Sequence, residues 1–224
     1  MTAPIVSDDE AGLAAAIAAL RSGGVVAIPT DTVYGIAVSL QTPGGVERLF
    51  AVKDRPPEKA IAVLVDGIDQ VDGLVELSPA ARVLAETGWP GGLTLVVALR
   101  PGARLPAALT AGTATLGVRV PDHGVPRRLA RELGPLPTTS ANRSGEPDAL
   151  DAAAVAASVG ASVDLIVDGG PVPGQLASTV VDCAGARPRL LRVGAVSPAL
   201  LAQALDSAGL AHDLVQDPPA GPGA

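Results

Sequence analysis

Hydrophobic positions along the chain follow two different periods, and polar or glycine-rich segments separate the stretches that carry them. Short runs of Val, Ile and Leu indicate buried β-strands, whereas apolar residues spaced three or four apart indicate helices. The pattern predicts about seven strands, the first interrupted at Pro29, over residues 25–28 with 36–40, 61–65, 93–99, 113–120, 163–167, 178–182 and 188–193. It predicts six helices, over residues 11–20, 44–53, 78–88, 124–133, 151–159 and 198–208.

Capping residues support several of these helix boundaries. Ser7 with Glu10 three residues later has the pattern of a capping box. Asp151 stands at the start of another helix, and Ser-Pro pairs at residues 78–79 and 197–198 start two more. The segment PTTSANRSG at residues 137–145 is small and polar, which is typical of a loop.

Buried strands alternate with helices, so we expect an α/β fold, a three-layer sandwich with helices on both faces of a mixed sheet. The chain shows no internal repeat, and its composition does not shift before about residue 210. We therefore expect one domain over residues 1–208. A Pro/Gly/Ala-rich tail over residues 209–224 is expected to be disordered.

Composition narrows the classes of function. Aromatic residues make up 1% of the chain, too few for the stacking platforms typical of single-stranded RNA binders. The net charge of −7 means that a site for a polyanion must be a local basic pocket. Cys183 is the single cysteine, and His123 and His212 are the two histidines, so an internal disulfide, a thiolate cluster and a His-rich metal site are excluded.

The N-terminal residues do not form a secretory signal, because they lack a basic region followed by an apolar one. No apolar run approaches the length of a membrane span. We therefore expect a cytoplasmic protein that makes no contact with a membrane.

The two lysines of the chain, Lys53 and Lys59, lie in the segment KDRPPEK together with Arg55, although the other 14 basic residues are all arginine. Lys is a compact point charge and Arg a planar fork, so the two are not equivalent at an anion site. A short, solvated charged loop is the competing interpretation. The position of the segment between two patterned apolar stretches favours a functional site.

Four polar segments stand at the ends of predicted strands, where ligands bind in open α/β sheets. They are residues 30–32 (TDT), residues 53–59, residues 140–142 (SAN), and residues 178–179 (ST) with Arg192. Their cations, hydroxyls and amide suit a ligand that carries phosphates. Each also fits an ordinary role as a turn, a cap or a surface ion pair. No P-loop or Rossmann phosphate motif is present.

Four aspartates could act as an acid or base or bind a metal, and nothing in their spacing singles out a pair: Asp31, Asp54, Asp168 and Asp182. A Mg²⁺ ion that a nucleotide carries needs only one or two carboxylates. No metal-ligand set is therefore assigned to the chain.

Several segments together resemble the YrdC/TsaC family of threonylcarbamoyl-AMP synthases. Lys53-x-Arg55 and Ser140-x-Asn142 are similar to its KxR and SxN pattern. The similarity extends, in order, to IPTDTVYG (28–35), FAVKDRP (50–56), WPGGLT (89–94), GVRVP (117–121), PTTSANRSG (137–145), STVVD (178–182) and LRVG (191–194). It covers residues 10–205 and corresponds to the short, single-domain form.

The resemblance implies a YrdC-like fold, α/β or α+β depending on the scheme, whose twisted sheet surrounds a concave cavity. It implies a nucleotidyltransferase that converts L-threonine, bicarbonate and ATP, with Mg²⁺, into threonylcarbamoyl-AMP and pyrophosphate. This is the first step of N6-threonylcarbamoyl modification of adenosine 37 in tRNA. The implied partners are downstream threonylcarbamoyl-transfer proteins, with at most a weak contact to tRNA.

The resemblance also implies a role for individual residues. The catalytic pair is Lys53 and Arg55. The residues implied to bind ATP are Lys53, Arg55, Lys59, Thr115, Ser140, Asn142 and Arg192. The residues implied to bind threonine are Thr32, Arg119, Thr138 and Ser178. The chain departs from the family pattern with Lys59-Ala60-Ile61 in place of Asn-Pro-Leu and with Leu64 in place of a histidine, so the roles at positions 59 and 64 stay open.

Two alternative functions remain. The domain could bind tRNA or double-stranded RNA in a basic concavity without catalysis, although the net charge and the lack of aromatic residues argue against this. It could also form a carbamoyl-adenylate with another amine, as the related domain of hydrogenase-maturation proteins does. Those proteins carry acylphosphatase and zinc-finger domains, which this chain lacks.

Overall fold

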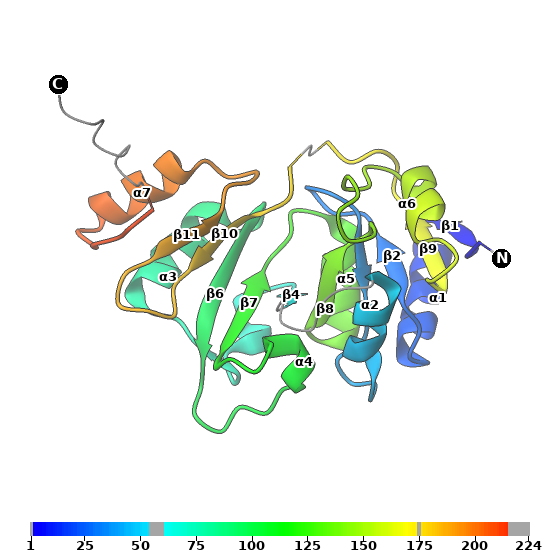
Figure 1. Ribbon diagram of the computed structural model, residues 1–224, viewed down its shortest axis with the longest axis horizontal. Coiled ribbons are helices and arrows are strands. Elements are labelled where there is room, and N and C mark those ends of the chain that lie inside the picture. The colour runs from blue at the N-terminus through cyan, green and yellow to red at the C-terminus, as the bar shows by residue number, and fades with distance from the viewer. Residues whose placement is uncertain (1, 54–60, 174–175, 215–224) are drawn as a thin grey trace.

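The computed structural model describes residues 2–53, 61–173 and 176–214, and a mixed sheet of 11 strands runs through them (Figure 1). The strands are β1 (Ile5–Ser7), β2 (Val26–Ile28), β3 (Gly35–Ala37), β4 (Ala62–Leu64), β5 (Val75–Glu76), β6 (Leu93–Leu99), β7 (Thr115–Arg119), β8 (Leu136–Ser140), β9 (Leu165–Asp168), β10 (Thr179–Asp182) and β11 (Arg189–Arg192). The helices are α1 (Glu10–Arg21), α2 (Gly45–Lys53), the 3₁₀ helix η1 (Ile68–Val71), α3 (Pro79–Gly88), α4 (Ala107–Thr110), α5 (Gly124–Leu133), α6 (Ala152–Ser158) and α7 (Pro198–Ser207).

The strand order is β1-β9-β2-β3-β8-β4-β7-β6-β10-β11, and β5 pairs with β6. Strands β4 and β7 are parallel, as are β6 and β10, whereas β8 is antiparallel to both β3 and β4. The sheet extends from β1 near one end of the molecule to β11 near the other (Figure 1). The α/β class, the mixed sheet and all six predicted helices are confirmed.

The predicted count of about seven strands is wrong, because β1, β5 and β8 were not anticipated. The segment at residues 137–145 was expected to be a loop, yet its first four residues belong to β8 at the centre of the sheet. Thr138 pairs with Ala37 on one side and with Ala62 on the other. The strand lacks hydrophobic alternation because its polar side chains face a cavity instead of an apolar core.

Helices cover one face of the sheet along its whole length. Apolar side chains of α2, α3, α4, α6 and α7 pack there into the larger hydrophobic cluster. On the other face α1 and α5 form a smaller cluster over β9, β2 and the adjoining ends of β3, β8 and β4. The helix layer on this second face is therefore incomplete, and it leaves β7, β6 and β10 uncovered.

Strand β6 illustrates how the sequence marks the two faces. Leu93, Leu95 and Val97 are fully buried in the larger cluster. Thr94 and Val96 alternate with them and line a cavity on the opposite face. The uncovered area of the second face is thus a cavity with a polar lining, and the alternation of leucine with smaller residues determines which face it occupies.

The N-terminus of α1 corrects the predicted capping box. Asp9 is the N-cap, and its carboxylate accepts a hydrogen bond from the amide of Gly12 at 2.9 Å. Ser7 ends strand β1 instead. The predicted caps at Ser78 and Asp151 are confirmed by side-chain bonds to the backbone amides three residues on, at 3.2 Å and 2.7 Å.

Packed residues continue past the predicted domain end at residue 208. Leu214 is 2% exposed and belongs to the larger hydrophobic cluster. Asp213 forms an ion pair with Arg187 at 2.7 Å, and its amide donates to the carbonyl of Pro188. Asp213 and Leu214 therefore pack against the preceding part of the chain, and the rest of the predicted tail, residues 215–224, lies outside the described residues.

Candidate active site

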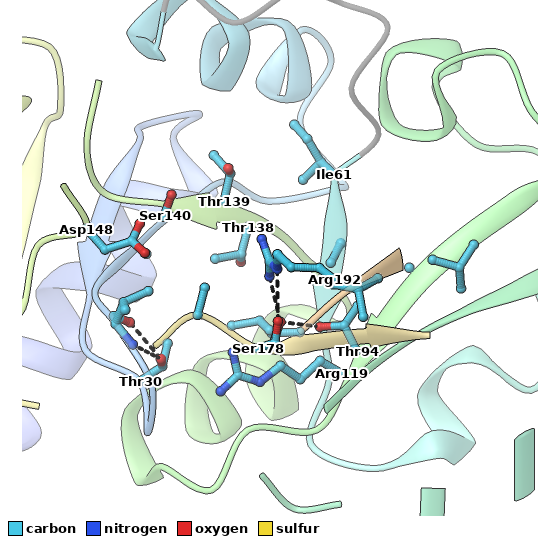
Figure 2. Close-up of a pocket in the computed structure, with 18 of the residues that line it drawn as sticks. Thr30, Ile61, Thr94, Arg119, Thr138, Thr139, Ser140, Asp148, Ser178 and Arg192 are labelled. Carbon is cyan, nitrogen blue, oxygen red and sulfur yellow. Dashed lines mark hydrogen bonds between the residues drawn. The ribbon is translucent and has the colours of Figure 1, made fainter. Parts of the chain in front are cut away.

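The cavity on the uncovered face is the candidate active site, and its volume is about 260 Å³. Its side chains come from strands far apart in the sequence and point toward one another (Figure 2). The cavity is lined by Thr30, Val33, Tyr34, Gly35, Ile61, Ala62, Leu64, Thr94, Val96, Thr115, Gly117, Arg119, Thr138, Thr139, Ser140, Asp148, Ala177, Ser178, Val180 and Arg192. Hydroxyls and two arginines supply most of its polar groups, an arrangement suited to anionic oxygens.

Small residues keep the floor of the cavity open. Ala62 of β4 lies between Thr138 of β8 and Gly117 of β7 in the strand register, so the three positions share one face. A Cβ atom at Gly35 would come within 2.8 Å of the Thr138 methyl group. A larger side chain at Gly35 would therefore displace Thr138 from the floor.

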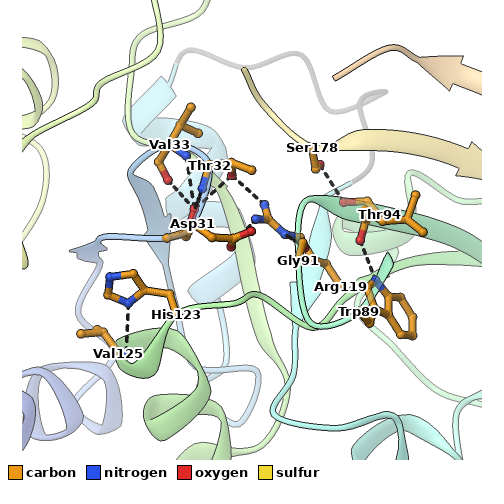
Figure 3. Close-up of polar contacts among 12 residues, drawn as sticks. Asp31, Thr32, Val33, Trp89, Gly91, Thr94, Arg119, His123, Val125 and Ser178 are labelled. Carbon is orange, nitrogen blue, oxygen red and sulfur yellow. Dashed lines mark hydrogen bonds and ion pairs between the residues drawn. The ribbon is translucent and has the colours of Figure 1, made fainter. Parts of the chain in front are cut away.

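Arg119, the last residue of β7, is 6% exposed and is held by three acceptors (Figure 3). Its Nε donates to the carbonyl of Gly91 at 3.0 Å, and Nη1 donates to Thr32 Oγ1 at 2.9 Å. Its Nη2 forms an ion pair with Asp31 at 2.5 Å. These three bonds fix the plane of the guanidinium while the side chain lines the cavity, so the remaining N–H groups can bind a ligand carboxylate.

Burial and charge act in opposite directions on Arg119. Burial lowers the pKa of the guanidinium, the neighbouring Asp31 carboxylate raises it, and the cation of Arg192 lowers it again. Arg stays protonated under all ordinary conditions, so the buried cation depends on Asp31 as its counter-charge.

The loop at residues 30–33 builds the support for Arg119 from its own hydroxyls. Thr30 Oγ1 donates to the carbonyl of Val33 at 2.7 Å and accepts from the amide of Thr32 at 3.1 Å. The hydroxyls of Thr30 and Thr32 are 3.1 Å apart. This local network is a turn, which was the alternative interpretation of residues 30–32 in the sequence. It places Thr32 behind Arg119, and Thr32 does not line the cavity.

Ser178 joins a second group of polar side chains, on the opposite side of the cavity from the loop at residues 30–33. Arg192 donates to the backbone carbonyl of Ser178 at 3.0 Å and to its hydroxyl at 3.1 Å. The hydroxyls of Ser178 and Thr94 are 2.8 Å apart (Figures 2 and 3). Burial lowers the pKa of Arg192, and the carboxylate of Asp148 raises it.

Lys53 holds the segment at residues 140–142 from the end of α2. Its ammonium is 3.0 Å from Asn142 Oδ1 and from Ser140 Oγ, and 2.7 Å from the carbonyl of Ser140. Ser140 Oγ also donates to Asn142 Oδ1 at 2.6 Å. Lys53 is 3% exposed, so the lysine and the polar segment form one buried unit beside the cavity.

Tyr34 and Asp148 line the cavity, although neither was predicted as a site residue. The Tyr34 hydroxyl donates to the carbonyl of Gly170 at 2.7 Å and accepts from the amide of Gly169. Burial raises its pKa to about 12, so it stays a donor. The position of Tyr34 in the IPTDTVYG motif was a usable signal, whereas Asp148 lies outside every recognised motif.

The structure divides the predicted site residues into three groups. Six line the cavity: Thr115, Arg119, Thr138, Ser140, Ser178 and Arg192. Thr32, Lys53 and Asn142 do not line it but contact residues that do. Arg55 and Lys59 lie outside the described residues. Leu64, whose role the sequence left open, lines the cavity and pairs with Arg119 in the strand register.

The described part of the chain contains no group of three or more His, Cys, Asp or Glu side chains arranged to hold a metal. Asp148 is the carboxylate that lines the cavity there. A metal ion carried by a nucleotide needs only one or two carboxylates, which Asp148 fits. In the described part of the chain, no helix is long and apolar enough to cross a membrane.

Comparison with protein-family models identifies a match over most of the chain. The Sua5/YciO/YrdC model, described under the heading of telomere recombination, matches residues 18–194. This range contains every predicted site residue.

Known proteins agree with this match. A protein of Mycobacterium leprae is 40% identical over 195 residues, which are 87% of this chain and 88% of its own. The threonylcarbamoyl-AMP synthase of Bacillus subtilis is 38% identical over 86% of this chain and 56% of its own length. That of Pyrococcus abyssi is 36% identical over 78% of this chain and 52% of its own length.

Solved structures share the fold. Sua5 of P. abyssi in complex with L-threonine superimposes with a TM-score of 0.83 and 31% identity, over 95% of this chain and 62% of its own. YciO of Escherichia coli gives a TM-score of 0.78 at 22% identity, over 89% of this chain and 98% of its own. The matched family model, the identity to its members and the shared fold together establish that this chain belongs to the Sua5/YciO/YrdC family.

Proposed function

We propose that this protein is a threonylcarbamoyl-AMP synthase, which converts L-threonine, bicarbonate and ATP into threonylcarbamoyl-AMP and pyrophosphate. The relatives in Bacillus subtilis and P. abyssi carry this name, and the P. abyssi protein binds L-threonine. The observation that carries the proposal is a single cavity that joins two sets of polar groups. Arg119 and Ser178 form one set, and Ser140 with the Lys53 unit forms the other.

The amino-acid substrate binds at Arg119. Its carboxylate takes the free N–H groups of the fixed guanidinium, because Arg binds carboxylates in a defined planar geometry. Thr138 and Ser178 line the cavity with hydroxyls that can bind the rest of the amino acid. Thr32 contributes indirectly, since its hydroxyl accepts a hydrogen bond from Arg119.

In this proposal ATP binds to Ser140, Thr115 and Arg192, which line the cavity, and Arg192 also donates to Ser178. Lys53 and Asn142 hold Ser140 in place. In this proposal Arg55 and Lys59 also bind ATP through their positive charges. Lys53 and Arg55 are the catalytic pair. Any Mg²⁺ enters with the nucleotide, and Asp148 can supply one carboxylate to it.

The proposed chemistry needs positioning and charge more than a nucleophilic side chain. The threonine amine attacks the bicarbonate carbon, an N–C bond forms and water leaves, which gives an N-carboxylate. An oxygen of this N-carboxylate then attacks the α-phosphorus of ATP, and the bond to pyrophosphate breaks. Negative charge builds up on phosphate oxygens, which fixed cations stabilise.

The product is an activated acyl group, so a transfer reaction must consume it. In the proposed pathway, threonylcarbamoyl-transfer proteins move the group to adenosine 37 of tRNA, and this protein makes at most a weak contact with tRNA itself. The proposed site of this reaction is the cytoplasm.

Pyrophosphate release by the purified protein tests the proposal. We expect release to require ATP, L-threonine and bicarbonate together, with serine as a weaker amine. Release with another amine instead of threonine would identify a different carbamoyl-adenylate synthase. No release in any combination, combined with salt-sensitive binding of tRNA, would refute catalysis and support an RNA-binding module.

A further inference from the structure

The hydroxyl of Ser178 lies between two other polar side chains in the cavity wall, those of Thr94 and Arg192. Thr94 Oγ1 is 2.8 Å from Ser178 Oγ, and Arg192 Nη2 is 3.1 Å from the same atom (Figure 2). Thr94 and Ser178 are 5% and 6% exposed. Buried hydroxyls of this kind need a defined direction for each hydrogen bond, because an unpaired one is costly.

The bonding capacity of a serine hydroxyl limits how this group can be arranged. A hydroxyl has one proton to donate and two lone pairs that accept. A guanidinium can only donate, so Arg192 occupies one lone pair of Ser178. If Thr94 donates to the second lone pair, both acceptor positions are filled, and the Ser178 proton is left for the cavity.

The backbone around Ser178 is fixed from both sides. The amide of Thr179 donates to the carbonyl of Gly92 at 2.9 Å, and the amide of Ala195 donates to the carbonyl of Ala177 at 2.9 Å. A Cβ atom at Gly194 would come within 2.2 Å of that Ala177 carbonyl, which shows how closely the two segments pack. Rotation of the hydroxyl is therefore the freedom that remains, and Thr94 and Arg192 control it.

We propose that Thr94 is a positioning residue that donates a hydrogen bond to Ser178, so that Ser178 presents its own proton to the amino-acid substrate. The inference rests on the proposed function, because it takes threonine as the ligand. The bound group must be an acceptor, such as an oxygen of the threonine carboxylate or hydroxyl. Thr94 acts through Ser178 and not by contact with the substrate.

Substitution of Thr94 by valine removes the hydroxyl and keeps the shape of the side chain. For Thr94→Val we expect the KM and the Kd for threonine to rise roughly fivefold to tenfold, the effect of one lost hydrogen bond. The KM for ATP should stay within about twofold, since no nucleotide contact changes. Thr94→Ser keeps the hydroxyl and should restore threonine binding.

A matched control shows whether the weaker threonine binding comes from the Thr94 hydroxyl in particular or from the removal of any buried threonine hydroxyl. Thr110 is also 5% exposed, and its hydroxyl donates to the carbonyl of Ala107, outside the cavity lining. Thr110→Val should leave both KM values unchanged. If Thr94→Val proves too unstable to purify, Thr94→Ala removes the same hydroxyl and is compared with Thr94→Ser in the same way.

A double-mutant cycle tests whether Thr94 acts through Ser178. In a Ser178→Ala background, Thr94→Val should have little further effect on the Kd for threonine measured by calorimetry. An undiminished effect there, an unchanged Kd in Thr94→Val, or an equal rise in the KM for ATP would overturn the inference. If Ser178→Ala binds threonine too weakly for calorimetry, the same cycle is completed with the KM for threonine.

The wild-type protein in the same experiments tests the proposed function separately. Threonine binding and threonine-dependent pyrophosphate release by the wild type, combined with normal threonine binding by Thr94→Val, would refute the role of Thr94 alone. Absence of both activities in the wild type would refute the proposed function.

Discussion

Side chains at the site have two kinds of role, and contact with the cavity distinguishes them. Arg119, Ser140 and Ser178 line the cavity. Asp31, Lys53 and Asn142 do not, but each bonds to one of the lining residues. Motif residues of the second kind are therefore expected to act by fixing geometry, and their variants should reveal changes in order or stability as well as in turnover.

Asp31 illustrates this at the buried ion pair with Arg119, whose two side chains are 15% and 7% exposed. We predict that Asp31→Asn lowers the free energy of unfolding by about 3 kcal/mol, because it leaves a buried guanidinium without a counter-charge. Urea unfolding measures the loss. The exposed Asp122→Asn should change stability by less than about 0.5 kcal/mol. Equal stability of the two variants would show that Arg119 finds compensation elsewhere.

Lys53 should be needed both for turnover and for the order of the segment it holds. We predict that Lys53→Ala abolishes pyrophosphate release and increases hydrogen exchange at the amides of residues 141–146, since three oxygens lose their common donor. The bulkier fork of arginine does not fit an ammonium site, so Lys53→Arg should not restore turnover. Unchanged exchange in Lys53→Ala would restrict the role of Lys53 to the substrate.

At the scale of elements, the position of α5 matters most, because α5 borders the open part of the sheet. Among the side-chain contacts that hold this helix, two involve groups that titrate. His123 caps its N-terminus through Nδ1, which accepts from the amide of Val125 at 3.2 Å. Asp66, after β4, accepts from Arg127 Nε at 2.8 Å and from Arg131 Nε at 2.9 Å. Both contacts depend on a protonation state, so each gives stability its own pH dependence.

The cap at His123 should weaken below neutral pH. Burial lowers the pKa of His123 in the folded protein, although Asp31, Asp8 and Asp122 oppose this. The folded state thus favours neutral imidazole, and the stabilisation is complete above the unfolded pKa of about 6.5 and is lost as pH falls. We predict that wild type loses stability relative to the non-titrating cap His123→Asn, by up to about 1 kcal/mol, in urea unfolding from pH 7 to pH 5.

The contact at Asp66 should fail in a more acidic range. Burial raises the pKa of this carboxyl, but bonds from Arg131 and Arg127 outweigh it and lower the pKa overall. The stabilisation is therefore present above the unfolded pKa of about 3.9 and is lost as pH falls below it. We predict that the difference in stability between wild type and Asp66→Asn is constant from pH 7 to pH 5, begins to fall near pH 4, and is lost as pH falls through the depressed pKa of the folded state. A difference that does not change with pH down to acid unfolding would exclude the ionised carboxylate as its source.

At the scale of the molecule, the cavity exists because helices cover the second face of the sheet only in part. Helices α1 and α5 bury one end of that face, and the other end keeps small and polar residues. The larger cluster on the opposite face supports the sheet beneath the cavity. A cavity floor built on strands holds its side chains more rigidly than loops would.

The C-terminal boundary of the domain can be tested at this scale. Truncation after Ala208 removes Leu214 from the core and Asp213 from its ion pair. We predict that it lowers stability by about 2 kcal/mol, the burial of one leucine, which is a fall in Tm of about 4–8 °C for a domain of this size. Truncation after Leu214 should leave Tm unchanged. Equal Tm values for the two truncations would show that the folded domain ends at residue 208.

Much of the fold and of the site could be predicted because the signals are local. Capping residues and apolar spacing identified all six predicted helices, and β-branched runs identified the long strands. Strand β8 was missed because Thr138, Thr139 and Ser140 face a cavity and carry no apolar alternation. Asp148 was missed as a site residue because it lies outside every recognised motif. Thr94 was missed although it ends the motif WPGGLT, because only the tertiary structure brings its hydroxyl to Ser178.

The sequence by itself therefore determined six of the helices, the strands with apolar runs, and the motifs that carry cations and hydroxyls. These properties depend on neighbours in the chain, through backbone geometry and periodic burial. Only the tertiary structure decided which motif residues line the cavity and which support them from behind. That division depends on contacts such as Asp31 with Arg119 and Thr94 with Ser178, which join residues 88 and 84 positions apart.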